Sequence, residues 1–165
     1  LETDYAAVLS RAGRHYTRGT RPSGLLTALV LCDGDPAAVR ATVASAAVIA
    51  DRVRVVERAG LPLTELAAAD RTEEIIAADW QADGGVEAAL EGVADRHVLV
   101  CLSGERLEFD DWGRIRARLE ALPPGPIEVS TPSGPEVRIH PPEPDGAAAV
   151  GSRSETRLDG LRVIR

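Results

Sequence analysis

The sequence has no lysine, no asparagine and no methionine in its 165 residues. Without lysine it can build neither a phosphate-binding P-loop nor a Schiff-base enzyme, because both need that amine. Since Leu1 stands where a start methionine would be, we expect the chain to be cut from a longer protein. The two cysteines, Cys32 and Cys101, are too few for a disulfide framework or a four-ligand zinc site, so we expect buried free thiols.

Long apolar runs and a concentrated basic surface are also lacking. No run approaches the roughly 20 apolar residues that span a bilayer, and no charged-then-apolar leader opens the chain. We therefore expect a cytoplasmic protein with no membrane span. The formal net charge of -7 argues against nucleic acid as a partner, because phosphate binding needs clustered positive charge. We interpret the arginines within residues 1–24 as part of a solvated N-terminal arm rather than an anion site.

Strands and helices alternate between residues 25 and 122, which is typical of a parallel sheet covered by helices. Apolar runs predict strands over 25–32, 52–57, 73–80 and 98–102. Helical periodicity predicts helices after Asp35, after Gly84 and over 112–122, with Asp35 and Asp110 as caps, and short helices over 4–12 and 63–69.

The chain becomes richer in strand signals after residue 122. "IEVSTPSGPEVRIH" alternates around a Pro-Ser-Gly turn, and the Asp159-Gly160 pair in "TRLDGLRVIR" predicts a second hairpin. We predict one α/β domain over 25–165, with a mainly parallel sheet sandwiched by helices. Its nucleotide-binding-like half is 25–122, and 123–165 forms a C-terminal β-hairpin appendage.

Acidic residues follow three of the predicted strands. Asp33 and Asp35 come after the first strand, Glu57 ends the second, and Glu105 follows the fourth. Carboxylates at strand ends can contact a ribose, a base or a cation. Helix capping explains Asp35 with no further assumption, and Glu57 is equally compatible with a base contact and with a surface position. Ser103 lacks a nucleophile-elbow motif, so we interpret it as a turn residue.

Two stretches, "LTALVLCDGDPAAVRATVASAAVIADRVRVVE" and "IIAADWQADGGVEAALEGVADRHVLVCLSGE", carry a family resemblance. Their order and spacing resemble the nucleotide-sugar-binding half of family 2 glycosyltransferases, and "ETRLDGLRVI" resembles strands near that family's acceptor side. The resemblance implies a GT-A, Rossmann-like fold. It also implies that Asp33 and Asp35 line a nucleotide cleft and that Glu57 contacts the base.

The sequence departs from that family at the positions that bind the metal ion and the pyrophosphate. The family holds Mg²⁺ or Mn²⁺ on an Asp-x-Asp pair after the fourth strand, but Leu102 and Gly104 occupy those positions here and only Glu105 remains. The family's basic group near the pyrophosphate falls near Glu87. A cleft edged by these carboxylates would repel a diphosphate, so we expect no catalytic residues, no metal and no cofactor.

Three functions follow as hypotheses. The first is a degenerate glycosyltransferase-like domain, a pseudoenzyme that serves as a scaffold or protein-interaction module for a protein partner or adjoining domain. The second is a domain that still binds a nucleotide diphosphate sugar, or acts on it without the usual metal pair, within a larger glycosyltransferase. The third is an unrelated doubly wound domain that binds another small ligand at its strand ends.

Overall fold

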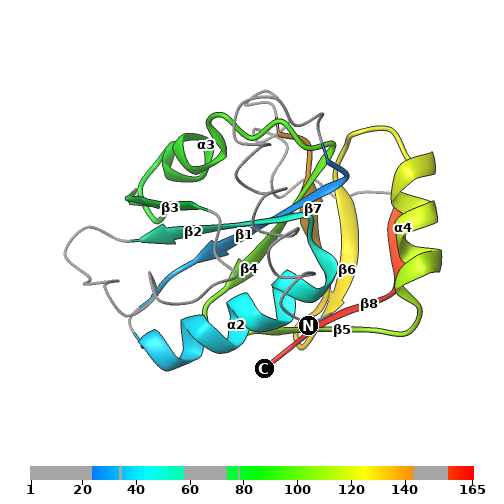
Figure 1. The fold of residues 1–165 in the computed structure, drawn as a ribbon, viewed down its shortest axis with the longest axis horizontal. Helices are drawn as coiled ribbons and strands as arrows, with labels where there is room; N and C mark the ends of the chain where they lie inside the picture. The colour runs from blue at the N-terminus through cyan, green and yellow to red at the C-terminus, as the bar shows by residue number, and fades with distance from the viewer. Residues whose placement is uncertain (1–23, 34, 58–73, 78, 143–155) are drawn as a thin grey trace, which may run out of the picture.

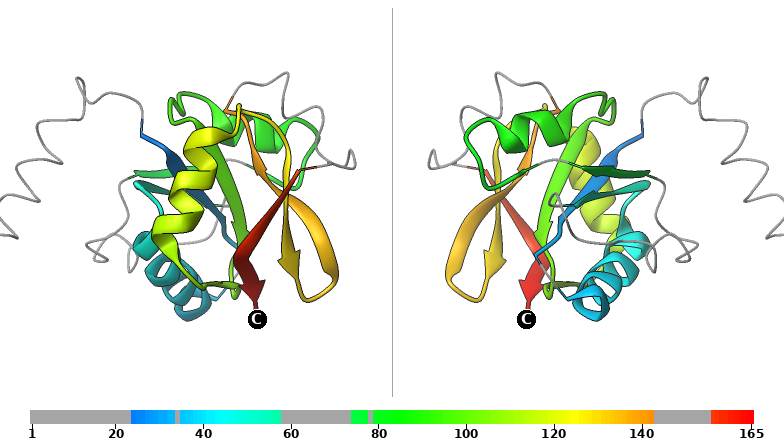
Figure 2. Two further views of the ribbon diagram at one scale, coloured as in Figure 1. Left: turned by 90° about the vertical axis from the view of Figure 1, so that its right-hand side faces the viewer. Right: turned by 90° about the vertical axis from the view of Figure 1, so that its left-hand side faces the viewer.

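A computed structural model describes residues 24–33, 35–57, 74–77, 79–142 and 156–165 of the chain. These residues form eight strands and three helices (Figure 1). All the strands join one curled sheet in the order β3-β2-β1-β4-β7-β6-β8-β5 (Figure 2). The predicted α/β class is confirmed. No helix in the described ranges is long and apolar enough to cross a membrane.

Parallel strands make up the first half of the sheet. Its elements are β1 (Leu26–Leu31), α2 (Pro36–Ile49), β2 (Arg52–Glu57), β3 (Glu74–Ala77), α3 (Gly85–Leu90) and β4 (His97–Leu102). Strand β1 pairs in parallel with both β2 and β4, and β2 pairs with β3. The predicted strands over 25–32, 52–57 and 98–102 are confirmed, as are the helices after Asp35 and Gly84. The strand predicted over 73–80 is shorter than expected.

Both faces of this half of the sheet are buried. Strand β1 has apolar residues at successive positions and therefore presents apolar side chains to both faces. Ala28 and Val30 belong to a core cluster with Val39 and Val43 of α2. Leu29 and Leu31 belong to a second cluster with Leu90 of α3. Since side chains alternate between the faces of a strand, the continuous run predicts cover on both sides, and helices provide it.

The second half contains the remaining elements, and in it β7 and β5 run opposite to the other strands of the sheet. They are β5 (Arg106–Phe109), α4 (Trp112–Ala121), β6 (Ile127–Thr131), β7 (Gly134–His140) and β8 (Arg157–Ile164). Strands β6 and β7 form the predicted hairpin, and β7 then pairs antiparallel with β4. The sheet is therefore mixed, because its parallel pairings include β6 with β8 but β7 and β5 pair antiparallel, and β6, β7 and β8 continue the first half.

Two local predictions are wrong, and one strand was missed. Asp111, not Asp110, caps α4 by accepting a hydrogen bond from the Arg114 N–H at 3.2 Å, while Asp110 accepts one from Arg162 at 2.8 Å. Strand β5, which was not predicted, directly precedes that helix, and the predicted helix over 112–122 is confirmed.

The Asp159-Gly160 pair does not turn the chain either. Strand β8 continues through it, with Gly160 at a φ of 89°, and pairs with β5 on one side and β6 on the other. The helices predicted over 4–12 and 63–69 lie outside the described residues.

Candidate functional site

The carboxyl ends of β1, β2 and β4 meet at one edge of the sheet, where three main-chain amides connect them. The N–H of Cys32 donates to the carbonyl of Val56 at 2.9 Å, and the N–H of Ser103 donates to that of Leu31 at 2.9 Å. The N–H of Asp33 donates to the Ser103 Oγ, also at 2.9 Å. We call this region the carboxyl edge. It holds Asp33, Asp35 and Glu57 together with the turn that contains Glu105.

Asp35 acts as the N-cap of α2, as the sequence predicts. Its Oδ1 accepts the N–H of Ala37 at 3.0 Å, its backbone is extended, and Pro36 follows at the first helical position. A carboxylate here compensates an unpaired amide and the positive end of the helix dipole. Asp33 and Asp35 are both exposed at the carboxyl edge, and Glu57 is half-buried.

The two cysteines lie beneath the carboxyl edge as buried free thiols, which confirms the prediction. Burial, with a further contribution from the Glu57 charge, raises the pKa of the Cys32 thiol to about 12. Burial also raises the pKa of Cys101 to about 12. Because the thiolate is the reactive form, both groups are inert at neutral pH.

Trp80 closes one side of the carboxyl edge from the loop between β3 and α3. Its Nε1–H donates to the carbonyl of Cys32 at 3.0 Å, and its ring packs on the cluster that contains Leu29 and Leu31. Gly85 permits this loop to close tightly, because a Cβ at that position would stand 2.0 Å from the carbonyl oxygen of Asp79. Trp80 therefore packs against the strand end and holds it in position.

Glu105 is turned away from the open edge and into the sheet. Its side chain is 4% exposed and forms a bidentate ion pair with Arg138 of β7. The Nη1–Oε1 distance is 2.8 Å and the Nη2–Oε2 distance is 2.9 Å. Oε1 also accepts the N–H of Leu102 at 2.6 Å. Both carboxylate oxygens are thus engaged by donors, and the charge of Glu105 is compensated by a guanidinium.

The turn that carries Glu105 is held by α2 as well as by β7. The N–H of Gly104 donates to the Oγ1 of Thr42 at 3.0 Å, and the N–H of Leu107 donates to the Oγ of Ser45 at 3.1 Å. Gly104 has a φ of 90°, a conformation that favours glycine. An aspartate at position 104 would be strained, so the backbone itself disfavours a second carboxylate there.

The turn around Glu105 does not offer the ligands that a divalent cation needs. Mg²⁺ and Mn²⁺ need several oxygen ligands, and Glu105 offers oxygens that already accept N–H donors beside a positive charge. Across the described ranges, no group of three or more histidine, cysteine, aspartate or glutamate side chains is placed to hold a metal.

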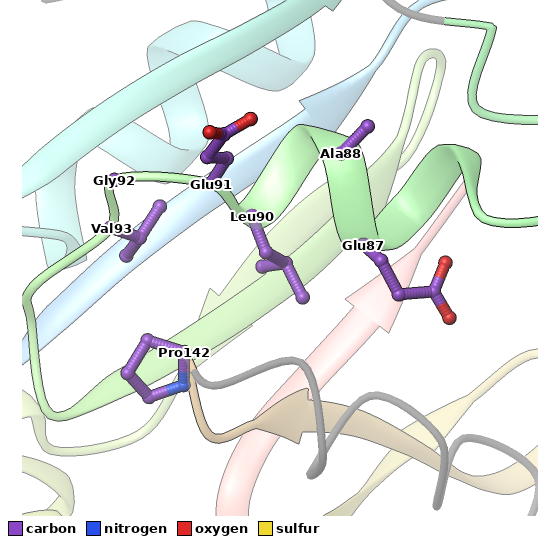
Figure 3. Close-up of a pocket in the computed structure, with 7 residues that line it drawn as sticks. All are labelled: Glu87, Ala88, Leu90, Glu91, Gly92, Val93 and Pro142. Atoms are coloured by element: carbon purple, nitrogen blue, oxygen red, sulfur yellow. The ribbon is translucent and has the colours of Figure 1, made fainter.

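A pocket of about 570 Å³ lies elsewhere, between α3 and the residues that follow β7 (Figure 3). Pro142 stands on one side, and α3 and its following turn stand on the other. In Figure 3 the carboxylates of Glu87 and Glu91 point away from each other. Because the turn leads directly into His97, this pocket lies at the amino end of β4. The lining residues are Glu87, Ala88, Leu90, Glu91, Gly92, Val93 and Pro142.

From the sequence, Asp33, Asp35, Glu57 and Glu105 are expected near the ends of the strands that they follow. The partner of Glu105 was not predicted. Arg138 lies 33 residues further along the chain in an alternating hairpin strand, and nothing in its local pattern marks it. The only available signal was physical: a carboxylate that follows a buried strand needs a counter-charge if it is itself buried.

No protein family model and no curated protein matches this chain. Its fold is similar to solved structures of Rv0371c from Mycobacterium tuberculosis H37Rv. One has a TM-score of 0.53 at 12% identity and covers 87% of this chain and 90% of that one. A second, described as a complex of Rv0371c with manganese, has a TM-score of 0.51 at 14% identity and covers 85% and 89%. At these identities the likeness concerns the fold alone.

Proposed function

We propose that this chain is a glycosyltransferase-like domain of the GT-A type, related to family 2, that has lost metal-dependent sugar transfer and serves as a scaffold or protein-interaction module. The sequence resemblance over residues 25–165 supports the family. The α/β class and the placement of Asp33, Asp35 and Glu57 at one carboxyl edge are compatible with it.

The ion pair between Glu105 and Arg138 carries the proposal. Leu102 and Gly104 stand where the family has its two aspartates, so Glu105 is the carboxylate left to bind a cation. That carboxylate is buried and pairs with a guanidinium at 2.8 Å. A cation that replaced Arg138 would leave the guanidinium without its partner in a buried place, which opposes binding.

Electrostatics at the carboxyl edge support the same conclusion. Asp33 and Asp35 are exposed there, and Glu57 is near enough to Cys32 to raise the pKa of its thiol. A nucleoside diphosphate carries two or more negative charges, so it needs a cation or a basic group to approach these carboxylates.

Calorimetric titration of the whole chain with uridine and guanosine diphosphates tests the proposal. Each nucleotide is titrated with and without Mn²⁺. We expect no manganese-dependent binding in the micromolar range with either nucleotide. Micromolar binding that requires Mn²⁺ and disappears in Glu105→Gln would contradict the loss of the metal site.

A nucleotide-binding domain without the usual metal pair is the second candidate. The fold similarity to a protein described as a manganese complex favours testing it. Here Glu57 contacts the base and Asp33 lines the cleft, so Glu57→Gln and Asp33→Asn are expected to weaken nucleotide binding. Asp159→Asn is the matched control, because that carboxylate is 93% exposed on β8.

A further inference from the structure

The two halves of the sheet meet at a short contact between β4 and β7. Two register pairs join them, Val98 with His140 and Leu99 with Ile139, whereas six pairs join β1 to β4. We call these two pairs the seam. It is also the place where the strand direction reverses, and the Arg138–Glu105 ion pair bridges it.

Each face of the seam carries one buried histidine. His140 is 3% exposed and lies opposite Val98, whose side chain packs in the cluster on the α3 side. His97, which is fully buried, lies next to Val98 in β4 and therefore points to the other face. There its Nε2 lies 2.8 Å from the carbonyl oxygen of Leu119 in α4.

Neither imidazole has an acceptor ready for a second proton. The Nδ1 of His97 and the Nδ1 of His140 are buried and have no hydrogen-bond partner within the described part of the chain. A neutral ring tolerates this, since one nitrogen is then an unprotonated acceptor. Protonation would create a buried N–H with no acceptor and a buried charge.

The positive charges nearest the two rings would oppose that protonation. Arg138 stands two residues before His140 on β7, and β4 faces the ring with Val98. The carboxylates of Glu87 in α3 and of Glu91 at its C-cap belong to residues that line the pocket of Figure 3. Burial, and secondly the Arg138 charge, lowers the pKa of His140 to about 4.

The surroundings of His97 act in the same direction. Arg96 is the adjacent charge, β1 faces the ring with Leu26, and α4 offers the Leu119 carbonyl. The nearby carboxylate of Asp95 is occupied by Gly24 and Thr27. Burial lowers the pKa of His97, although the hydrogen bond to Leu119 partly opposes the shift.

We propose that the seam is a pH-responsive joint, at which protonation of His97 and His140 loosens β4 from β7 and from α4 while each half of the sheet keeps its own pairing. Each ring takes one proton from solvent and becomes an imidazolium. The imidazolium is better hydrated outside the seam than within it, so acidification favours the opened form.

Hydrogen exchange of the whole chain, measured by segment between about pH 7 and about pH 4.5, tests this joint. After correction for intrinsic exchange, protection at the seam end of β7, around Ile139 and His140, is expected to fall at least about tenfold, while protection of β1 and β2 changes far less. An equal fall in both segments at the same pH would mean global unfolding and would overturn the proposal.

Variants that cannot titrate make the test specific. His140→Phe removes the titrating ring, and His140→Gln serves the same purpose with a polar side chain if the phenylalanine does not fit. In either variant, β7 is expected to keep its protection as the pH falls. His97→Gln can still donate to the Leu119 carbonyl and should shift the loss to lower pH. If both His140 variants lose protection as the parent does, the histidine is not the trigger.

Discussion

At the scale of single residues, Arg138 is the side chain on which the carboxyl edge depends. It is 13% exposed, holds both oxygens of Glu105, and also donates from Nη1 to the carbonyl of Val100 at 3.3 Å. It thereby fixes the turn after β4 from a strand in the other half of the sheet. A residue that is unremarkable in the sequence therefore decides what Glu105 can do.

Replacement of that arginine should be costly. Arg138→Met leaves the Glu105 carboxylate buried without a counter-charge, and we expect the free energy of unfolding to fall by about 3 kcal/mol, measured by urea denaturation at neutral pH. The double variant Arg138→Met/Glu105→Gln should recover part of that loss, because the unpaired charge is gone. Arg157→Met is the control, since the Arg157–Asp159 pair is exposed. An equal loss in the control would contradict the explanation.

Asp35 offers a second residue-scale prediction. Asp35→Ala removes the cap of α2 and should lower the free energy of unfolding by about 1 kcal/mol in chemical denaturation. Asp35→Asn keeps a side-chain acceptor and should be nearly neutral. If the asparagine variant lost as much as the alanine variant, the charge of Asp35 rather than its capping bond would be what matters.

At the scale of elements, β8 holds the second half of the sheet together. It pairs with β5 on one side and with β6 on the other, and register irregularity relative to β6 accompanies Gly160 within the strand. The N–H of Asp110 donates to the carbonyl of Gly160 at 2.9 Å, next to the capped start of α4. Gly160 therefore bends a continuous strand and does not form a hairpin.

A substitution at this bend tests the conformation of β8. In Gly160→Ala the added Cβ meets Ile115 at 3.8 Å, which is an ordinary contact, so the cost comes from the φ of 89°. We expect a loss of about 1–2 kcal/mol in the free energy of unfolding. Asp159→Ala next to it should change stability little. A neutral Gly160→Ala would mean that the residue does not adopt a left-handed backbone.

The sequence predicted the elements whose signals are local. The apolar run of β1, the Asp35-Pro36 start of α2 and the alternation of β6 and β7 each specify their structure within a few residues. Strand β5 was missed because Arg106–Phe109 becomes a strand only through its pairing with β8, which is more than 50 residues away. The same distance explains why Asp159-Gly160 was taken as a turn: its local preference is overridden by partners on both sides.

The residues of the candidate site likewise differ in how far they could be predicted from local sequence. The positions of Asp33, Asp35 and Glu57 at one edge follow from the parallel strand order, and that order could be inferred from the alternation of strands and helices. The ion pair of Glu105 with Arg138 could not be inferred from the sequence, because it depends on a contact between β4 and the antiparallel strand β7.

At the scale of the whole molecule, stability should depend on pH through the buried histidines. The pKa of His140 is about 4 in the folded chain and about 6.5 when unfolded, so the unfolded state binds more protons between these values. The free energy of unfolding should fall as the pH drops from about 6.5 to about 4, by about 3 kcal/mol for His140 alone. Urea denaturation at successive pH values measures it, and His140→Phe should flatten that part of the curve.

Asp51 acts in a lower pH window and can be separated from the histidines. Although burial opposes the shift, hydrogen bonds from the N–H groups of Leu26 and Leu25 lower the pKa of this carboxyl below 3.8, helped by Arg116. Its contribution is present above that value and is lost as the pH falls through the folded pKa. A curve of the His97→Gln/His140→Phe double variant that still declined steeply above about pH 5 would contradict the assignment to the two histidines.

The contact between α2 and β5 also limits how copies of this domain can assemble. The Ser45 hydroxyl occupies the Leu107 amide on the last strand of the sheet, so that rim is already capped by the molecule's own helix. Fibrils that grow by strand addition need every unit to offer two open rims. Strand addition beside β5 would have to displace Ser45 from the Leu107 amide, which opposes growth of a filament from that rim.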